Sequence, residues 1–405
     1  MASMAHCIVP RFEPFQALRY ERTSELHNVC APPYDVLSDA DRSALANKHI
    51  NNIVHIDMPI SASGNAYEHA ALVLNQWIGE GVLVRDATPS YTLYRMQFTD
   101  STGKPRNVVG VIGALEVVDE GAGGVLPHER TTPKAKTDRL ELTRATDANL
   151  SPVWGLSLAA GLSDLLTEPA ELLGQLTDDL GVVHSVERVT DRERIDQISA
   201  AVTAHPVVIA DGHHRYAISR TYRDEVRIRT NSKTTGAELT MTYINELIDE
   251  QLSVAAIHRL YEGISYKELA SALSPFFIIN DADPVGPTTL SHMNERGSLC
   301  LIAKTGRTHW LTPITEKFAG VRNLDSAYLE HALSTVNHEV RYQHGVTEVQ
   351  HELQTSNATA AILIRPVSVA EIQRTANEGL LMPPKSTFFS PKLRTGFVLR
   401  EMKTR

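Results

Sequence analysis

The sequence contains few cysteines and no excess of basic residues, and these two scarcities exclude several classes of protein. Among 405 residues there are three cysteines, Cys7, Cys30 and Cys300, which are far apart and form no CxxC pair. They indicate neither a disulfide framework nor a zinc site, and they favour a reducing compartment. The formal net charge is −9 at pH 7. A chain of this charge repels phosphate backbones as a whole, so we expect no nucleic-acid partner.

Long apolar runs are also lacking. No stretch of about 18 apolar residues occurs, and the N-terminal segment shows no basic region followed by an apolar one, so we expect neither a membrane span nor a secretory signal. The sequence therefore predicts a cytoplasmic protein. The motifs GxGxxG, GxSxG and HExxH are absent too, which argues against a Rossmann dehydrogenase, an α/β-hydrolase and a zincin.

The residues that are present are typical of a large folded enzyme or binding protein. Hydrophobic residues make up 42% of the chain and charged residues 21%, enough to bury a core without disulfides. Segments with strand character alternate with segments of helical period, which predicts a mixed α/β fold. We expect three regions, over residues 1–125, 126–300 and 301–405, and the middle one carries the most informative motifs.

Periodicity and capping residues place several elements. We predict helices from Ser38 to about His49, at about 66–78, 164–180 and 192–204, and from Ser368 to about Asn377. Strands are predicted over 91–98, 108–118 and 360–364. The polar run over 225–240 is predicted to be a surface loop or a lid.

The motif DGHHRY follows the apolar run VVIA, and together they predict a strand, a tight turn and a helix. If Asp211 caps that helix, its first turn contains Gly212, His213, His214 and Arg215, at the positive end of the helix dipole. Crowding cations at this end is unfavourable unless an anion binds there, and phosphate is the obvious anion. The alternative is that both histidines are neutral and exposed.

A second cluster mixes basic and acidic residues over 128–152. Alternating charge usually marks a solvated helix face, and that interpretation stays open. The segment begins in a Thr-Thr-Pro turn, however, which can present cations to a polyphosphate. We expect Lys134, Lys136 and Arg139 to neutralise phosphate charge. Glu129 is the candidate general base, because a carboxylate beside phosphates can accept a hydroxyl proton.

Two proline-containing segments are open to more than one interpretation. MPPKSTFFSPKLRTG (382–396) lacks the glycines of a Walker A loop. We expect its Lys385 and Ser386 to contribute to phosphate binding from a loop folded over the pocket, with a simple surface crossing as the alternative. APPYDV (31–36) is a rigid turn that presents Tyr34 and Asp35 in a role that is either functional or structural.

Together these motifs resemble a known family. PPYDV, the 128–152 segment, IADGHHRY and MPPKSTFFSPKL, in this order, are similar to the bacterial and archaeal family called domain of unknown function 1015 (DUF1015). ADGHHRY also resembles the phosphate-binding turn of the ParB and sulfiredoxin superfamily, which includes free-serine kinases. The resemblance implies a ParB/sulfiredoxin-like nucleotide-binding core within residues 126–300, with further α/β elements around it.

The resemblance implies a site and an activity as well. Gly212, His213, His214 and Arg215 match the superfamily's phosphate turn, with Asp211 at its edge. His213 stands where sulfiredoxin has its cysteine, which argues against thiol repair. The basic helix-turn-helix of ParB is not evident, which argues against chromosome partition.

We therefore expect a kinase that transfers a phosphoryl group from ATP or ADP to the hydroxyl of a small metabolite, with free L-serine as the first candidate. The expected catalytic residues are Glu129, Asp211 and His213. Mg²⁺ is expected to bridge the phosphates near Asp138 or Asp211. The alternatives are a nucleotide-hydrolysing switch and a non-catalytic sensor of a nucleotide or phosphorylated metabolite. Whether the chain forms a homodimer is left open.

Overall fold

The computed structural model describes residues 9–61, 64–100, 103–127, 136–383 and 385–403. In this described part the chain forms two compact units, one made of Met1–Ser253 with Pro391–Arg405 and the other of Val254–Ser390. The predicted division into three regions is therefore corrected. The first sheet takes strands from both sides of the expected boundary at 125/126, and the boundary at 300/301 falls inside strand β16 (Leu299–Ala303). The expected mixed α/β architecture is confirmed.

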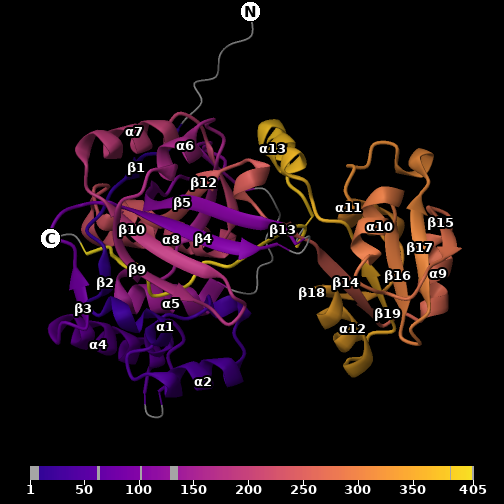
Figure 1. The fold of residues 1–405 in the computed structure, drawn as a ribbon, viewed down its shortest axis with the longest axis horizontal. Coiled ribbons are helices and arrows are strands. Elements are labelled where there is room, and N and C mark those ends of the chain that lie inside the picture. Colours follow the sequence, from indigo (N-terminus) through magenta and orange to yellow (C-terminus); the bar gives the residue numbers. More distant parts are fainter. Residues whose placement is uncertain (1–8, 62–63, 101–102, 128–135, 384, 404–405) are drawn as a thin grey trace, which may run out of the picture. The chain divides into compact units, whose positions relative to one another are not determined.

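Within the described residues, a nine-stranded mixed sheet forms the centre of the first unit (Figure 1). Its strand order is β6-β11-β8-β12-β5-β4-β10-β9, and β1 also pairs with β5. The pairs β6–β11 and β8–β12 are parallel, and the others are antiparallel. The strands are β1 (Phe12–Glu13), β4 (Tyr91–Thr99), β5 (Pro105–Glu116), β6 (Val125–Pro127), β8 (Val153–Ser157), β9 (Glu171–Thr177), β10 (Val183–Val189), β11 (Val207–Asp211) and β12 (Leu239–Glu246).

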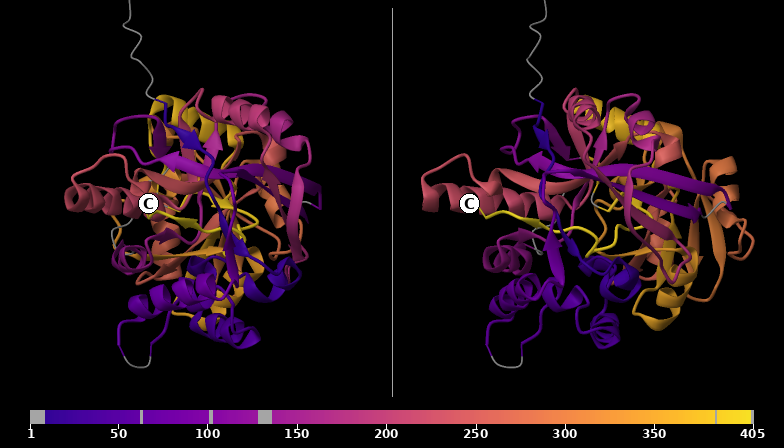
Figure 2. Two further views of the ribbon diagram at one scale, coloured as in Figure 1. Left: turned by 90° about the vertical axis from the view of Figure 1, so that its left-hand side faces the viewer. Right: turned by 60° about the vertical axis from the view of Figure 1, so that its left-hand side comes forward.

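Helices cover this sheet. α6 (Leu162–Thr167) and α7 (Arg192–Val202) pack their apolar residues against the sheet in one core cluster. Helices α4 (Ala66–Gly79), α5 (Lys136–Thr146) and α8 (His213–Thr230) contact one another in series. Figures 1 and 2 show α4 and α5 below the sheet, opposite α6 and α7. The smaller elements are β2 (Leu18–Tyr20), α1 (Leu26–Val29), α2 (Asp39–Lys48), α3 (Val54–Asp57), β3 (Leu83–Arg85), β7 (Ala148–Asn149) and β21 (Arg400–Glu401).

The second unit has its own antiparallel sheet, six-stranded as far as the chain is described, with the order β15-β17-β16-β19-β14-β18. Along β16, Leu299 and Leu301 belong to one apolar cluster and Cys300 and Ile302 to another, so both faces are covered. α9 and α11 supply the first cluster, and α10 and α12 the second. The bounds are β13 (Val254–Ala255), β14 (Ile257–Glu262), α9 (Tyr266–Leu273), β15 (Phe277–Asp281), α10 (Thr289–Arg296), β17 (Thr308–Pro313), α11 (Asp325–Ala332), β18 (Glu339–His344), α12 (Val346–Thr355), β19 (Ala360–Leu363), α13 (Val369–Glu378) and β20 (Phe388–Phe389).

Most of the predicted elements are confirmed, and two are wrong. The helix expected at about 164–180 ends at Thr167, because Pro169 interrupts it and Glu171–Thr177 pairs with β10 as a strand. The loop or lid expected over 225–240 is mostly regular structure, since α8 continues to Thr230 and β12 begins at Leu239. Among the described helices, none is both long enough and apolar enough to cross a membrane.

Candidate functional site

The DGHHRY motif lies where β11 meets α8, so the predicted strand, turn and helix are confirmed. Gly212 has a left-handed backbone with φ of 85°, which favours glycine. A side chain there would also come within 3.0 Å of the Arg215 guanidinium. A β-bulge between Ile209 and Asp211 shifts the pairing with β8 just before the turn. Such a bulge re-aims the residues that follow it.

Asp211 has a different role from the expected helix cap. The N-cap residue is Gly212, and within the described chain no side chain caps the helix. Instead, Asp211 Oδ2 accepts a hydrogen bond from Arg215 Nη2 at 2.9 Å, and Lys392 Nζ lies 3.3 Å from Oδ1. The crowded cations at this helix end are therefore offset by a carboxylate of the chain itself, and their presence alone does not require a bound anion.

The electrostatics of Asp211 also argue against proton transfer by this residue. Burial raises the pKa of Asp211, but the nearby charges of Lys392, Arg215 and His213 lower it by more, so its pKa lies well below the usual range. A carboxylate with such a low pKa is a weak base. We therefore assign Asp211 the positioning of Arg215 and Lys392, and no longer the catalytic role expected from the sequence.

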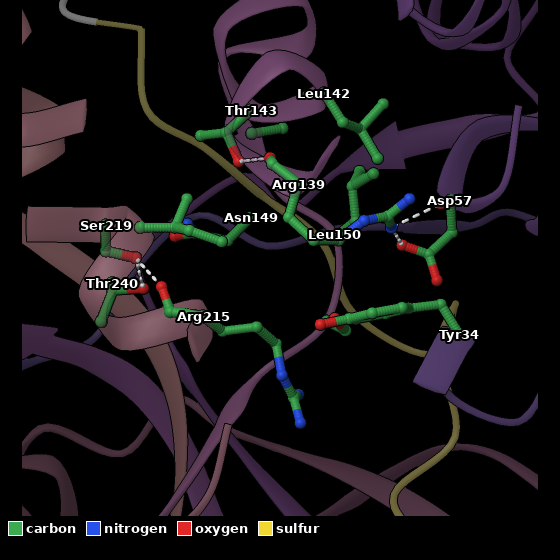
Figure 3. Close-up of a pocket in the computed structure, with 13 residues that line it drawn as sticks. Tyr34, Asp57, Arg139, Leu142, Thr143, Asn149, Leu150, Arg215, Ser219 and Thr240 are labelled. Carbon is green, nitrogen blue, oxygen red and sulfur yellow. Dashed lines mark hydrogen bonds and ion pairs between the residues drawn. The ribbon is translucent and has the colours of Figure 1, made fainter. Parts of the chain in front are cut away.

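A small pocket, with a cavity volume of about 50 Å³, lies beside the turn (Figure 3). Three segments that are distant in sequence contribute to its wall: Tyr34 comes from APPYDV, Arg139 from the 128–152 segment and Arg215 from DGHHRY. The fourth motif reaches the adjoining DGHHRY turn through Lys392, which pairs with Asp211. The other residues that line the pocket are Asp57, Leu142, Thr143, Ala148, Asn149, Leu150, Ser151, Ile218, Ser219 and Thr240.

Arg139 is held firmly at this pocket. Its Nη1 donates hydrogen bonds to the carbonyl oxygen of Asp57 at 2.6 Å and to Oδ1 of the same residue at 3.2 Å. Its guanidinium lies 4.3 Å from the centre of the Tyr34 ring, a cation–π contact. Figure 3 shows Arg139 and Asp57 together at one end of the pocket, with the Tyr34 ring lying between them and Arg215. The predicted placement of Arg139 at the site is thus consistent with the structure.

Asp57 is a site residue that sequence reasoning missed. Burial raises its pKa, and the charges of Arg139 and Arg215 oppose that rise without cancelling it. A carboxyl group whose pKa is raised accepts a proton more readily near neutral pH. Its sequence context, HIDMP, matches no motif. Only its tertiary contacts with Arg139 reveal it.

Other predicted site residues fall elsewhere. Glu129 and Lys134 lie outside the described residues; Lys136 begins α5, but its side chain is not described. His213 and His214 are partly buried at the start of α8, which differs from the exposed alternative.

Lys385 and Ser386 belong to the second unit and do not line the pocket. Ser386 is fully buried, and its hydroxyl donates a hydrogen bond to the Pro383 carbonyl at 2.7 Å. The prediction that Ser386 binds phosphate is therefore wrong in this structure, because its hydroxyl is inside a core. Lys385 is exposed with a left-handed backbone. Lys392, from the same motif, is the lysine that reaches the site.

The carboxylates expected near Mg²⁺ do not fit as its direct ligands. Asp138 accepts hydrogen bonds from the Tyr67 hydroxyl at 2.8 Å and from Arg139 Nε at 2.7 Å, so both of its oxygens are engaged. Both oxygens of Asp211 are held by cations, as described above. In the part of the chain that is described, no group of three or more histidine, cysteine or acidic side chains could hold a metal ion.

Several solved structures resemble the chain loosely. A conserved hypothetical protein from Pyrococcus furiosus is 12% identical, with a TM-score of 0.38, over 69% of this chain and 91% of that one. A free serine kinase in complex with AMP is 12% identical, with a TM-score of 0.37, over 69% and 88%. SbnI with a C-terminal truncation, from Staphylococcus aureus, is 12% identical, with a TM-score of 0.39, over 70% and 85%. Such low scores carry no argument about function.

The family is established by sequence. No curated protein matches the chain. A family model described as a protein of unknown function, DUF1015, matches residues 12–327, which is most of the chain. This match covers APPYDV, the 128–152 segment and DGHHRY, the three motifs that meet at the pocket. The resemblance inferred from those motifs is confirmed, and the chain belongs to the DUF1015 family.

Proposed function

We propose that the protein is a nucleotide-dependent phosphotransferase that acts on the hydroxyl of a small metabolite. One observation carries the proposal: Arg139 and Arg215 line one pocket, and Lys392, from a third segment, pairs with Asp211 at the turn that leads into α8. Guanidinium groups and helix N-termini are the groups that bind phosphates in many proteins.

Each part of the site has a proposed role. The α8 N-terminus, with Gly212, His213, His214 and Arg215, binds the nucleotide phosphates, while Asp211 holds Arg215 and Lys392 in place. Arg139 offsets the charge of the transferring group. Lys134 and Lys136 precede Arg139 in the sequence and are proposed to extend the phosphate site. The residues fit a nucleotide better than a protein-bound metal, so Mg²⁺ is expected to arrive with the nucleotide.

In the proposed reaction, the acceptor oxygen attacks the terminal phosphorus of ATP or ADP. The bond from that phosphorus to the bridging oxygen breaks, and ADP or AMP leaves with its electron pair. The proton of the acceptor hydroxyl passes to a carboxylate. Asp57 is the carboxylate on the pocket wall whose raised pKa suits this role. Glu129 is the second candidate.

Free L-serine is the first acceptor to test, because DGHHRY resembles the turn of free-serine kinases. Purified protein is incubated with L-serine and either ATP or ADP, with and without Mg²⁺, and O-phosphoserine is measured by mass spectrometry. Arg215→Ala and Arg139→Ala should each lower kcat/KM by about 10²–10³-fold. Arg374→Ala, an exposed residue of α13, is the matched control and should have no effect.

Two alternatives are distinguished by the same assay. Nucleotide hydrolysis without an acceptor, accompanied by a change in oligomeric state, would favour a nucleotide-driven switch. Nucleotide binding with neither transfer nor hydrolysis would favour a sensor. Either result would contradict the phosphotransferase proposal.

A further inference from the structure

A second pocket of the first unit shares the APPYDV segment with the first pocket. It has a cavity volume of about 420 Å³. Pro32 and Val36 of that segment line it, together with Cys30, Lys48, Asp179 and Arg394. The residues Tyr34 and Pro32, which are two positions apart, therefore face different pockets. The APPYDV turn is a shared wall of both.

The C-terminal segment also connects the two pockets. Ala31 and Thr395 form an antiparallel bridge, with backbone hydrogen bonds of 3.0 and 2.8 Å. Arg394, the neighbour of Thr395, lines the second pocket, and Lys392 contacts Asp211. Two residues span at most about 7 Å of chain. Lys392 and Arg394 therefore place one short segment both at Asp211 and at the second pocket.

The Arg394 guanidinium has hydrogen-bonding capacity to spare. Its side chain is 16% exposed, and its ion pair with Asp178 is 3.9 Å long, beyond hydrogen-bond distance. Its Nε is buried and has no partner among the described residues. Asp178 is committed elsewhere, because Oδ1 accepts from the amides of Leu180 and Val182 and Oδ2 lies 3.1 Å from His184 Nε2. A partly exposed guanidinium whose ion pair is this long suits a carboxylate ligand.

Acidic residues on the same wall define the ligand further. Asp179 lines the same pocket as Arg394, and so does Asp41, whose Oδ2 already accepts hydrogen bonds from Ser38, so the pocket offers both signs of charge to a small molecule. We infer that this pocket, called the Arg394 pocket, binds the phosphoryl acceptor by its carboxylate, and that the acceptors are hydroxy compounds carrying a carboxylate and an ammonium group. The inference rests on the proposed function and narrows its substrate class.

The test compares L-serine with serinamide, which lacks the carboxylate, as acceptors of the full-length protein. Wild type should prefer L-serine in kcat/KM, and Arg394→Ala should reduce that preference by about 10–100-fold, the loss expected for a charge-assisted hydrogen bond. Arg394→Lys keeps the charge but lacks the guanidinium group, so its preference for L-serine should lie between those of wild type and Arg394→Ala. Arg374→Ala is the control. Thermal unfolding checks that each variant folds. If Arg394→Ala does not fold, the preference measured for Arg394→Lys decides the test.

The failures of the two proposals are distinguishable. Equal use of L-serine and serinamide by wild type, or an unchanged preference in the variant, would overturn the inference and leave the phosphotransferase intact. If no acceptor is phosphorylated, the proposed function fails, and calorimetric titration with L-serine decides the inference. Binding to wild type that is lost in the Arg394 variant supports the Arg394 pocket. Absent or equal binding rejects it.

Discussion

At the scale of single residues, Asp57 and Asp211 show how environment separates the roles of two carboxylates near one pocket. Asp211 pairs with two cations, which outweigh its burial and keep its pKa low. Asp57 is buried with Arg139 as its hydrogen-bonding partner, and its pKa is raised. The first is suited to hold cations in place, and the second to accept a proton.

This contrast predicts the effect of removing the Asp57 charge. Asp57→Asn keeps the shape of the side chain but cannot accept the hydroxyl proton, so kcat should fall by about 10²–10⁴-fold while nucleotide binding persists. The acidic limb of the pH–rate profile should disappear in the residual activity. Glu129→Gln is the comparison variant. Loss of kcat in Glu129→Gln alone would assign the base to Glu129.

His258 of the second unit predicts a pH dependence of stability. It is 2% exposed, its Nδ1 accepts a hydrogen bond from the Ile364 amide at 3.2 Å, and burial with the charges of Arg259 and His344 lowers its pKa to about 4. Between pH 6.5 and 4 the unfolded chain binds a proton that the folded chain does not. The unfolding free energy of this unit should therefore fall by about 3 kcal/mol as the pH drops through that window.

Hydrogen exchange of peptides covering β14 and β19, corrected for the intrinsic pH dependence of exchange, measures this effect. His258→Asn removes the titrating group and should flatten the dependence. His351→Gln, an exposed control on α12, should leave it as in wild type. An unaltered slope in His258→Asn would reject this explanation.

At the scale of elements, the junction of β11 and α8 was predictable because its signals are local: an apolar run, a glycine and a helical period stand side by side. The strand within residues 164–180 was not predictable from the sequence. The apolar positions of this segment fit the period of a helix as well as that of a strand, and pairing with β10 selects the strand. Asp57 and Arg394 were missed for a related reason, since their partners are distant in sequence.

Gly212 allows a prediction for this junction. Gly212→Ala forces a left-handed backbone on alanine, at a cost of about 1–2 kcal/mol, and its Cβ would meet the Arg215 guanidinium at 3.0 Å. Nucleotide affinity should fall at least about 10-fold, because a displaced Arg215 loses a charge-assisted hydrogen bond to the phosphates. Gly263→Ala is the matched control, because Gly263 has φ of 71° but open space around it. The Gly263→Ala variant should lose stability through the strained backbone alone and should bind nucleotide with the affinity of wild type.

Calorimetric titration with ATP and ADP measures both glycine variants. Equal affinities for the two variants would show that the clash with Arg215 is irrelevant to binding. Equal thermal stabilities would only show that the surroundings absorb the strain.

At the scale of the whole molecule, the second unit is an insertion within the first. It begins at Val254 and ends at Ser390, and strands β13 and β20 pair these ends side by side. The apolar clusters of the two units share no residues. The sequence did not indicate this organisation, because no change in composition marks the points where the chain leaves and re-enters the first unit.

This organisation predicts that the insertion can be removed. Replacing Val254–Ser390 by a short glycine–serine linker should leave the first unit folded, because all residues of both described pockets belong to it. Cooperative thermal unfolding by circular dichroism is the measurement. A soluble chain without cooperative unfolding, or an insoluble one, would contradict the independence of the first unit.

The most direct test of the account is a crystal structure of the full-length protein with ADP. We predict density for the phosphates at the N-terminus of α8, within hydrogen-bond distance of Arg215 and with Arg139 nearby. A pocket that stays empty at saturating ADP, or phosphates bound elsewhere, would contradict the central claim.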